Sequence, residues 1–204
     1  MTSAVFELGP VVTGVPEPPP PALDPLLDAA ARCFARHGVG RTSVQDVARE
    51  LRVNRTTVYR QVGNVDAMVR LLLARELHRL LAALPTELEG RTGPEAVVEV
   101  MAAVIAFASE HPVLTKVRDD EPELIGPFVV TDLTSLLDQV TAGAAPLLRA
   151  AMDAGLLARR DPEVVAGWLA RIALSLIAAP PPGPLQPFLA EIVEPVLSPG
   201  SEAA

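Results

Sequence analysis

Residues 42–64, TSVQDVARELRVNRTTVYRQVGN, contain two short apolar patterns at helical spacing, separated by a few polar residues. The first pattern begins at Ser43, which forms a capping-box-like start with Asp46 three residues later. The second pattern follows Asn54, a favourable N-cap residue, and runs from Arg55 to about Gln61. The sequence therefore predicts two short helices joined by a tight turn.

Helical patterns also fill the segments on both sides of this unit. Half of the chain is apolar and only 3% is aromatic, with Ala and Leu supplying most apolar positions. Unbranched side chains lose little rotamer freedom in a helix, and sustained apolar–polar alternation is missing from the sequence. We therefore predict an all-α fold. The further helices expected are 24–37, 64–84, 94–110, 112–119, 127–154, 161–179 and 184–197.

Proline and glycine divide the chain into three parts. Residues 1–21 contain VPEPPPP, and we expect an extended or disordered tail because polyproline cannot donate backbone hydrogen bonds. Pro85 and the EGRTGP stretch at 89–94 mark the end of a head at 22–84, which holds the two short helices and a linking fourth helix. A larger helical body is expected at 94–197.

Charge is distributed unevenly between these parts. The net charge is −8, but residues 22–84 carry ten arginines and six acidic residues, a net charge of +4. Arginine forks to phosphates and to guanine edges, although an alternative is that the arginines reflect a GC-rich genome. The asymmetry places any DNA contact in the head.

A helix-turn-helix presents the first residues of its second helix to base edges in the major groove. Arg55, Thr56 and Thr57 open that helix here, and the next turn places Tyr59 and Arg60 within reach of a phosphate. The starts of the neighbouring helices offer free N–H groups to phosphates. The alternative is that these residues are solvated caps of a small bundle. The expected DNA-binding residues are Thr42, Ser43, Asn54, Arg55, Thr56, Thr57, Tyr59, Arg60 and Asn64.

The stretch LLDAAARCFARHGVGRTSVQDVARELRVNRTTVYRQVGNVDAMV, residues 26–69, resembles the DNA-binding head of the TetR family of transcriptional regulators. The Thr-Ser opening at 42–43, Ala48 at the helix crossing and the Thr-Val-Tyr run at 57–59 are its most specific parts. The resemblance implies a homodimer on a palindromic operator with half-sites about one helical turn apart. It also implies a repressor that releases DNA when a small effector binds in the body.

Three positions depart from the family pattern. Arg52 stands where the turn usually has glycine, so it must adopt a positive φ or re-route the turn. Val62 replaces an aromatic residue, and Val65 replaces a lysine that contacts phosphate in the family. These changes suggest a weaker or differently distributed set of backbone contacts, with Arg41, Arg52 or Arg60 compensating.

The expected helix 94–110 is apolar nearly all round, as a buried helix beside a cavity would be. A mostly apolar lining would favour a lipophilic effector, whereas ordinary core packing is the alternative for each residue. The expected lining residues are Val104, Phe107, Leu114, Leu133 and Leu137, with Arg118, Thr134 or Gln139 as polar anchors.

The resemblance implies that helices 161–179 and 184–197 of two protomers pair into a four-helix dimer interface. Their apolar stripes would otherwise be buried in their own domain. The interface residues expected from these stripes are Trp168, Ile172, Leu176, Phe188 and Ile192.

Other chemistries lack the residues they need. The three histidines lie far apart in sequence, so no metal site is expected, and we expect no cofactor and no enzyme activity. Cys33 is predicted to be an inert buried thiol, which fits a reducing cytoplasm, and Asp119–Glu121 are expected to be solvated. No apolar run of 18 residues and no secretory signal are found, so neither a membrane span nor export is expected.

These features together predict a dimeric, effector-responsive repressor. The alternative is a helical small-molecule-binding or interaction protein whose operator recognition is degraded, as Val62 and Val65 would suggest.

Overall fold

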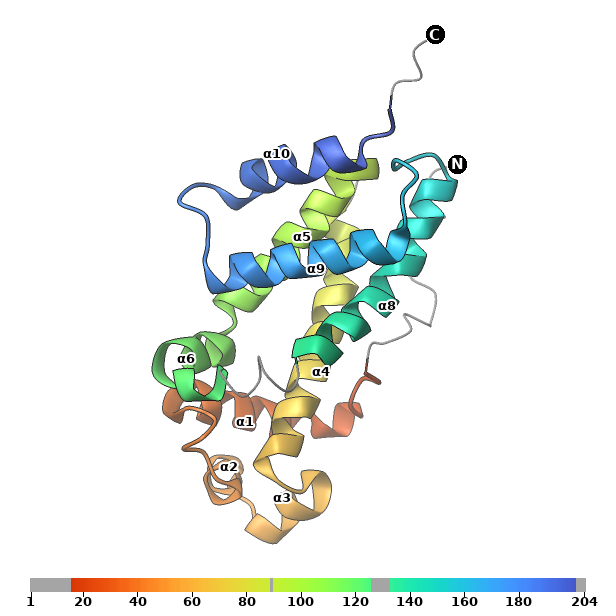
Figure 1. The fold of residues 1–204 in the computed structure, drawn as a ribbon. Coiled ribbons are helices and arrows are strands. Elements are labelled where there is room, and N and C mark those ends of the chain that lie inside the picture. Colours follow the sequence, from red (N-terminus) through yellow and green to blue (C-terminus); the bar gives the residue numbers. More distant parts are fainter. Residues whose placement is uncertain (1–15, 89, 126–132, 201–204) are drawn as a thin grey trace. The chain divides into compact units, whose positions relative to one another are not determined.

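A computed structural model of the chain describes residues 16–88, 90–125 and 133–200, and every regular element in these ranges is a helix (Figure 1). The predicted all-α fold is confirmed. The elements are η1 (Pro21–Leu23), α1 (Asp24–His37), α2 (Val44–Leu51), α3 (Arg55–Val62), α4 (Val65–Glu87), α5 (Gly93–Glu110), α6 (Pro112–Asp120), η2 (Pro122–Leu124), α8 (Leu133–Asp153), α9 (Pro162–Ala178) and α10 (Leu185–Leu197).

Contacts between residues divide the described chain into two compact units. The head unit consists of Pro16–Arg79 and Ala108–Asp132, and the body unit contains Leu80–Phe107 and Leu133–Ala204. Helix α6 therefore belongs to the same unit as α1, α2 and α3. The linear domain division expected from the sequence, at 22–84 and 94–197, remains a prediction.

Local signals predicted most helix ends correctly. The capping box of Ser43 and Asp46 is present at the start of α2, and the Asn54 side chain accepts a hydrogen bond from the backbone N–H of Thr56 at the start of α3. The expected stop at Pro85 is wrong, because α4 continues to Glu87. A proline removes one helical hydrogen bond, but its fixed φ is compatible with the helix.

Two other expectations fall partly outside the described residues. The residues concerned are 1–15 of the predicted tail and 127–132 of the predicted helix 127–154, which is described from Leu133. The last residue of the predicted tail, Pro21, begins the short helix η1, and the carbonyl of Pro16 lies 2.7 Å from Nε2 of His78.

The head unit is held together by an apolar core that fixes α3 from behind. Phe34, Val47, Val58 and Met68, from four different helices, are 0% exposed. Val62 is 8% exposed within the same core, so the smaller side chain at this position is still buried. Burial of Val58 and Val62 turns the opposite face of α3 to solvent.

The body unit has a separate core, in which α8 and α9 make the most extensive contact between helices. Helix α10 covers this core with Leu189, Val193 and Leu197, which are all 0% exposed. The body is therefore an independently packed helical bundle.

Arg52 ends α2 in the left-handed conformation, with φ 58° and ψ 38°. Among the described residues other than glycine, it alone has a positive φ. Its N–H donates to the carbonyls of Ala48 and Arg49, and the N–H of Val53 donates to the carbonyl of Ala48 at 2.9 Å. The turn therefore has the geometry that a glycine would adopt. Of the two outcomes expected from the sequence, a positive φ at Arg52 is the one observed.

We predict that Arg52→Gly stabilises the head unit by about 0.5–1 kcal/mol, because it relieves the left-handed strain but increases the entropy of the unfolded chain. The melting temperature should rise by about 2–3 °C in a circular dichroism scan. Arg49→Gly, inside α2, is the matched control and should destabilise by about 1 kcal/mol. A loss of stability in both variants would contradict the strain argument.

Candidate nucleic-acid interface

Five of the nine residues expected to meet DNA lie on α3. Arg55, Thr56 and Arg60 are exposed, and Tyr59 is 60% exposed, whereas Thr57 is half-buried. The Thr56 hydroxyl donates to Oδ1 of Asn54 at 2.6 Å, which reinforces the cap of α3. Arg55, Tyr59 and Arg60 are therefore the long side chains available on the exposed face of α3.

The arginines around α3 differ from the other head arginines in their ion pairing. Arg52, Arg55 and Arg60 are exposed, and none of them forms an ion pair with the residues that the structure describes. Arg70 on α4 shares this property. The paired arginines are Arg32 and Arg36 with Glu50, Arg41 with Asp120, Arg49 with Asp46, Arg75 with Asp28, and Arg79 with Glu76. The uncompensated positive charge of the head is thus concentrated beside α3.

The start of α2 presents Ser43 but not Thr42. Ser43 is exposed, and its N–H and hydroxyl both donate to Oδ2 of Asp46, at 2.9 and 2.6 Å. These bonds hold the pKa of Asp46 below its ordinary value. Thr42 is 6% exposed, and its hydroxyl donates to the carbonyl of Gly38 at 2.6 Å. Ser43 is therefore the better candidate for a phosphate contact at this helix end.

Asn64 occupies the expected position at the start of α4. Its Oδ1 accepts a hydrogen bond from the N–H of Ala67 at 2.9 Å, and its side chain is exposed. Asn64 therefore lies exposed at a helix N-terminus, a place that favours a phosphate.

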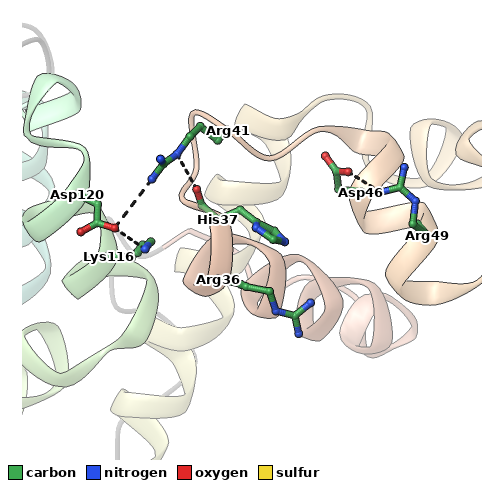
Figure 2. A pocket seen from close by; sticks show the side chains of 7 residues that line it. All are labelled: Arg36, His37, Arg41, Asp46, Arg49, Lys116 and Asp120. Atoms are coloured by element: carbon green, nitrogen blue, oxygen red, sulfur yellow. Dashed lines mark hydrogen bonds and ion pairs between the residues drawn. The ribbon is translucent and has the colours of Figure 1, made fainter.

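A polar hollow of about 500 Å³ lies in the head unit between α1, α2 and α6 (Figure 2). Asp120 contacts both Lys116 and Arg41 at this hollow, the latter with an Oδ2–Nη2 distance of 4.0 Å. The hydrogen bond from Lys116 is the main reason why the pKa of Asp120 is lowered. The lining cations thus already have partners in the protein. The remaining lining residues are Arg36, His37, Asp46 and Arg49.

Glu121 corrects an expectation from the sequence. The run Asp119–Glu121 was expected to be solvated, but Glu121 is 2% exposed. Its carboxylate accepts hydrogen bonds from the N–H groups of Val39 and Gly40. These contacts span more than 80 residues of sequence, so no local signal in the chain points to them.

The residues expected to line an effector pocket fall in both contact units. Leu114 and Arg118 belong to α6 of the head unit, and Arg118 pairs with Asp119 at 2.9 Å. The members in the body unit are Val104 and Phe107 on α5, with Leu133, Thr134, Leu137 and Gln139 on α8. A hollow in the body unit is lined by other residues, among them Met152 and Leu157. The expected pocket therefore stays a prediction.

The residues expected at a dimer interface differ in exposure. Leu176 is 7% exposed and belongs to the core of its own body unit. This agrees with the alternative that the apolar stripes are buried in their own domain. Trp168, Ile172 and Ile192 are half-buried against that core, and Phe188 is 38% exposed. Val164 on α9 is an apolar residue that is 68% exposed.

Burial shifts the pKa values of two titratable groups, those of Cys33 and His111. Burial, followed by the nearby Glu50 carboxylate, raises the pKa of the Cys33 thiol, which is 2% exposed. Burial lowers the pKa of His111, with Glu76 opposing this effect and Arg75 adding to it. Folding therefore disfavours both the thiolate and the charged imidazolium.

We predict that stability decreases as the pH falls below the ordinary histidine pKa of 6.5. In this window the unfolded chain binds a proton at residue 111 that the folded chain does not, so the loss continues until the pH passes the lower pKa of the folded state. Urea unfolding at several pH values between about 7.5 and 5.5 measures the effect. His111→Gln should flatten the pH dependence, whereas His37→Gln, at an exposed position, should not. Parallel curves for wild type and His111→Gln would contradict the assignment.

The pattern that defines bacterial regulatory proteins of the tetR family matches residues 26–71, which include α2, α3 and the residues that flank their turn. The chain belongs to this family. It is 27% identical over 198 residues to an HTH-type transcriptional regulator of Mycobacterium tuberculosis, Rv1255c, covering 90% of this chain and 89% of the relative. It is 26% identical to the HTH-type regulator YobS of Bacillus subtilis over 55% of this chain, and this match spans 61% of YobS.

Solved structures of similar fold extend over both units. Salmonella enterica GusR is 19% identical with a TM-score of 0.63, covering 87% of this chain and 98% of GusR. AibR, solved with isovaleryl coenzyme A and operator DNA, is 17% identical with a TM-score of 0.51, covering 86% of this chain and 97% of AibR. These likenesses concern the fold. As a tetR-family protein, the chain is a DNA-binding transcriptional regulator of the helix-turn-helix type and not an enzyme. Within its described residues, none of the helices taken singly has the length and apolar character to cross a membrane.

Proposed function

We propose that this regulator is a homodimeric repressor that binds a palindromic operator through α3 and releases it when a small effector enters the body. The observation that carries the DNA-binding part is the cluster of exposed Arg52, Arg55 and Arg60, which form no ion pair within the described residues. Arginines without a carboxylate partner can bind phosphates and guanines without first breaking an internal contact.

The proposed roles follow from position on the helix. Arg55, at the first residue of α3, reads a base, and Thr57 supports it from the same turn. Tyr59 and Arg60, one turn later, contact phosphate, as do Ser43 and Asn64 at the starts of α2 and α4. Arg52 compensates for the missing lysine at position 65.

The proposed dimer is formed by α9 and α10 of two protomers. Val164 and Phe188 are exposed apolar side chains on these helices and support this proposal. Trp168, Ile172 and Ile192 are half-buried and would become fully buried in such an interface. Leu176 is left out, because it is already buried in its own unit.

We predict that Val164→Glu shifts the protein from dimer to monomer, because it places an unpaired charge in the interface. Dimer affinity should fall by at least about tenfold, measured by sedimentation or by light scattering after gel filtration. Val140→Glu, at an exposed apolar position of α8, is the matched control and should leave the dimer intact. If Val164→Glu remains dimeric like Val140→Glu, the proposed α9–α10 interface is refuted.

The effector is proposed to be small and lipophilic. Support comes from the apolar character of α5 and from AibR, which is described as a complex with isovaleryl coenzyme A and operator DNA. A panel of acyl compounds tested for release of DNA and for a shift in melting temperature addresses this part. A panel without either effect would refute a lipophilic effector and leave the DNA-binding proposal standing.

Selection of bound sequences from random duplex DNA, repeated at two salt concentrations, tests the proposal as a whole. A palindromic consensus retained at the higher salt concentration supports it. Binding that is sensitive to salt and blind to sequence would favour the alternative, a helical binding protein with degraded operator recognition, for which Val62 and Val65 are the sequence argument.

A further inference from the structure

The carboxylate of Glu121 is a buried charge held by two backbone donors of the head unit. Oε2 accepts from the N–H of Val39 at 2.7 Å, and Oε1 accepts from the N–H of Gly40 at 2.9 Å. Glu121 caps the C-terminal end of α6, whereas Val39 and Gly40 lie in the loop between α1 and α2. Burial of a carboxylate removes its hydrogen bonds to water, and this costs free energy unless protein donors replace them. Here the backbone N–H groups of the loop are those donors.

The loop is shaped around this carboxylate. A Cβ atom added at Gly38 would lie 2.5 Å from Oε1 of Glu121, and one added at Gly40 would lie 3.1 Å from it. Gly38 also has a φ of 90°, which glycine adopts without strain. Both glycines therefore leave room for one specific side chain.

A second contact joins the same two segments. Asp120 accepts a hydrogen bond from Lys116 and lies 4.0 Å from Arg41, whose Nε donates to the carbonyl of His37 at 2.9 Å (Figure 2). The end of α6 therefore holds the loop on both sides of Gly40. Behind these contacts, Val113 of α6 is 4% exposed in the head core.

The held loop leads directly into the start of α2. The Thr42 N–H donates to the carbonyl of Val39 at 3.2 Å, and its hydroxyl donates to the carbonyl of Gly38. Ser43, the next residue, is the N-cap of α2 and a proposed phosphate contact. The position of Ser43 thus depends on a loop whose N–H groups at Val39 and Gly40 donate to Glu121.

We propose that Glu121 is a positioning residue for DNA binding: it holds the loop at 38–42 so that the N-terminus of α2 meets a DNA phosphate. This inference rests on the phosphate contact at Ser43 in the proposed function. It makes the geometry of the DNA-contacting surface dependent on the end of α6, a helix outside the helix-turn-helix.

The experiment measures binding of the full-length variants Glu121→Gln and Glu121→Ala to the selected duplex and to a random duplex at several salt concentrations. Affinity for both duplexes should fall by a similar factor, about fivefold to tenfold for Glu121→Ala, because a smaller fraction of the protein holds the binding-competent loop. The plot of log affinity against log salt should become shallower by about one per protomer, as expected for one lost phosphate contact. The preference for the selected duplex should not change, because α3 is untouched.

Two controls separate positioning from stability. Glu123→Gln, at an exposed carboxylate two residues further on, should bind both duplexes as the wild type does. Leu26→Ala, at a buried position near the start of α1, should lower the melting temperature but leave the salt dependence unchanged at temperatures where the protein is folded.

Gly40→Ala perturbs the same contact from the loop side without a positive φ. It should weaken binding in the same way as Glu121→Gln, and the double variant should lose less than the two single effects combined. If Glu121→Ala does not fold, Glu121→Gln and Gly40→Ala carry the test. Wild-type affinity and salt dependence in these variants would overturn the inference and leave the proposed function intact. Failure of the wild type to prefer any sequence would refute the operator, while the salt dependence on random duplex would still decide the role of Glu121.

Discussion

Arg55→Ala should weaken binding to the selected operator duplex by about 1–3 kcal/mol per half-site, roughly fivefold to 150-fold. Arg55 is the first residue of α3, it is exposed, and it forms no ion pair among the described residues. Its fork of N–H donors can pair with O6 and N7 of one guanine, so its loss should act on the selected duplex and hardly on a random one. Fluorescence anisotropy with both duplexes at fixed salt measures the difference.

Arg60→Ala is the matched control for this prediction. Arg60 lies on the same helix and is equally free of ion pairs within the described residues, but it is placed more than one turn later, where we propose that it contacts a phosphate. Its loss should weaken binding to the selected and the random duplex alike and reduce the salt slope by about one per protomer. Arg55→Lys should behave like Arg55→Ala on the selected duplex, because an ammonium group lacks the fork. Equal effects of Arg55→Ala and Arg60→Ala on both duplexes would refute this division of roles.

Arg75→Ala should destabilise the head unit by about 3 kcal/mol, because it removes one partner of a buried charge network. The Arg75 side chain is 7% exposed on α4, and its guanidinium lies 2.8 Å from Asp28 and 2.8 Å from Glu76. It also donates to the backbone carbonyl of Asp24 at 3.3 Å, so one side chain ties α4 to the start of α1. Without it, Glu76, only 12% exposed, would lose its most buried partner. Urea unfolding at neutral pH measures the loss.

Arg79→Ala separates this effect from ordinary surface charge. Arg79 pairs with the same Glu76 carboxylate at 3.0 Å, but its side chain is 52% exposed, so its removal should cost less than about 1 kcal/mol. Arg75→Met should fall between the two alanine variants, because it keeps the apolar stem packed while removing the charge. Similar losses for Arg75→Ala and Arg79→Ala would show that burial of the network contributes little.

The helices of the head could be predicted because their signals are local. The capping hydrogen bonds join residues only two or three positions apart, Ser43 with Asp46 and Asn54 with Thr56. They therefore do not depend on the position of distant parts of the chain. The left-handed turn at Arg52 was one of two expected outcomes for the same reason, since the turn geometry is set by neighbouring residues. Pro85 misled the prediction, because a stop signal lowers the stability of a helix without forbidding its continuation.

The chemical availability of the site residues could not be predicted in the same way. Six of the ten head arginines form ion pairs, and whether a given arginine does so depends on where distant carboxylates lie, as with Arg41 and Asp120. The inward hydroxyl of Thr42 and the burial of Leu176 likewise follow from packing. Composition and residue spacing do not reveal these long-range ion pairs or the packing of these side chains.

The sequence by itself determined the helical class, the caps of α2 and α3 and the resemblance to the family, because each depends on residues within a few turns of one another. Only the tertiary structure decided which arginines stay without a partner in the described chain and that Glu121 is buried against Val39 and Gly40. The physical reason is the range of the interactions. Caps and turns form between near neighbours, whereas the bonds from Val39 and Gly40 to Glu121 join residues 82 and 81 positions apart, which only folding brings together.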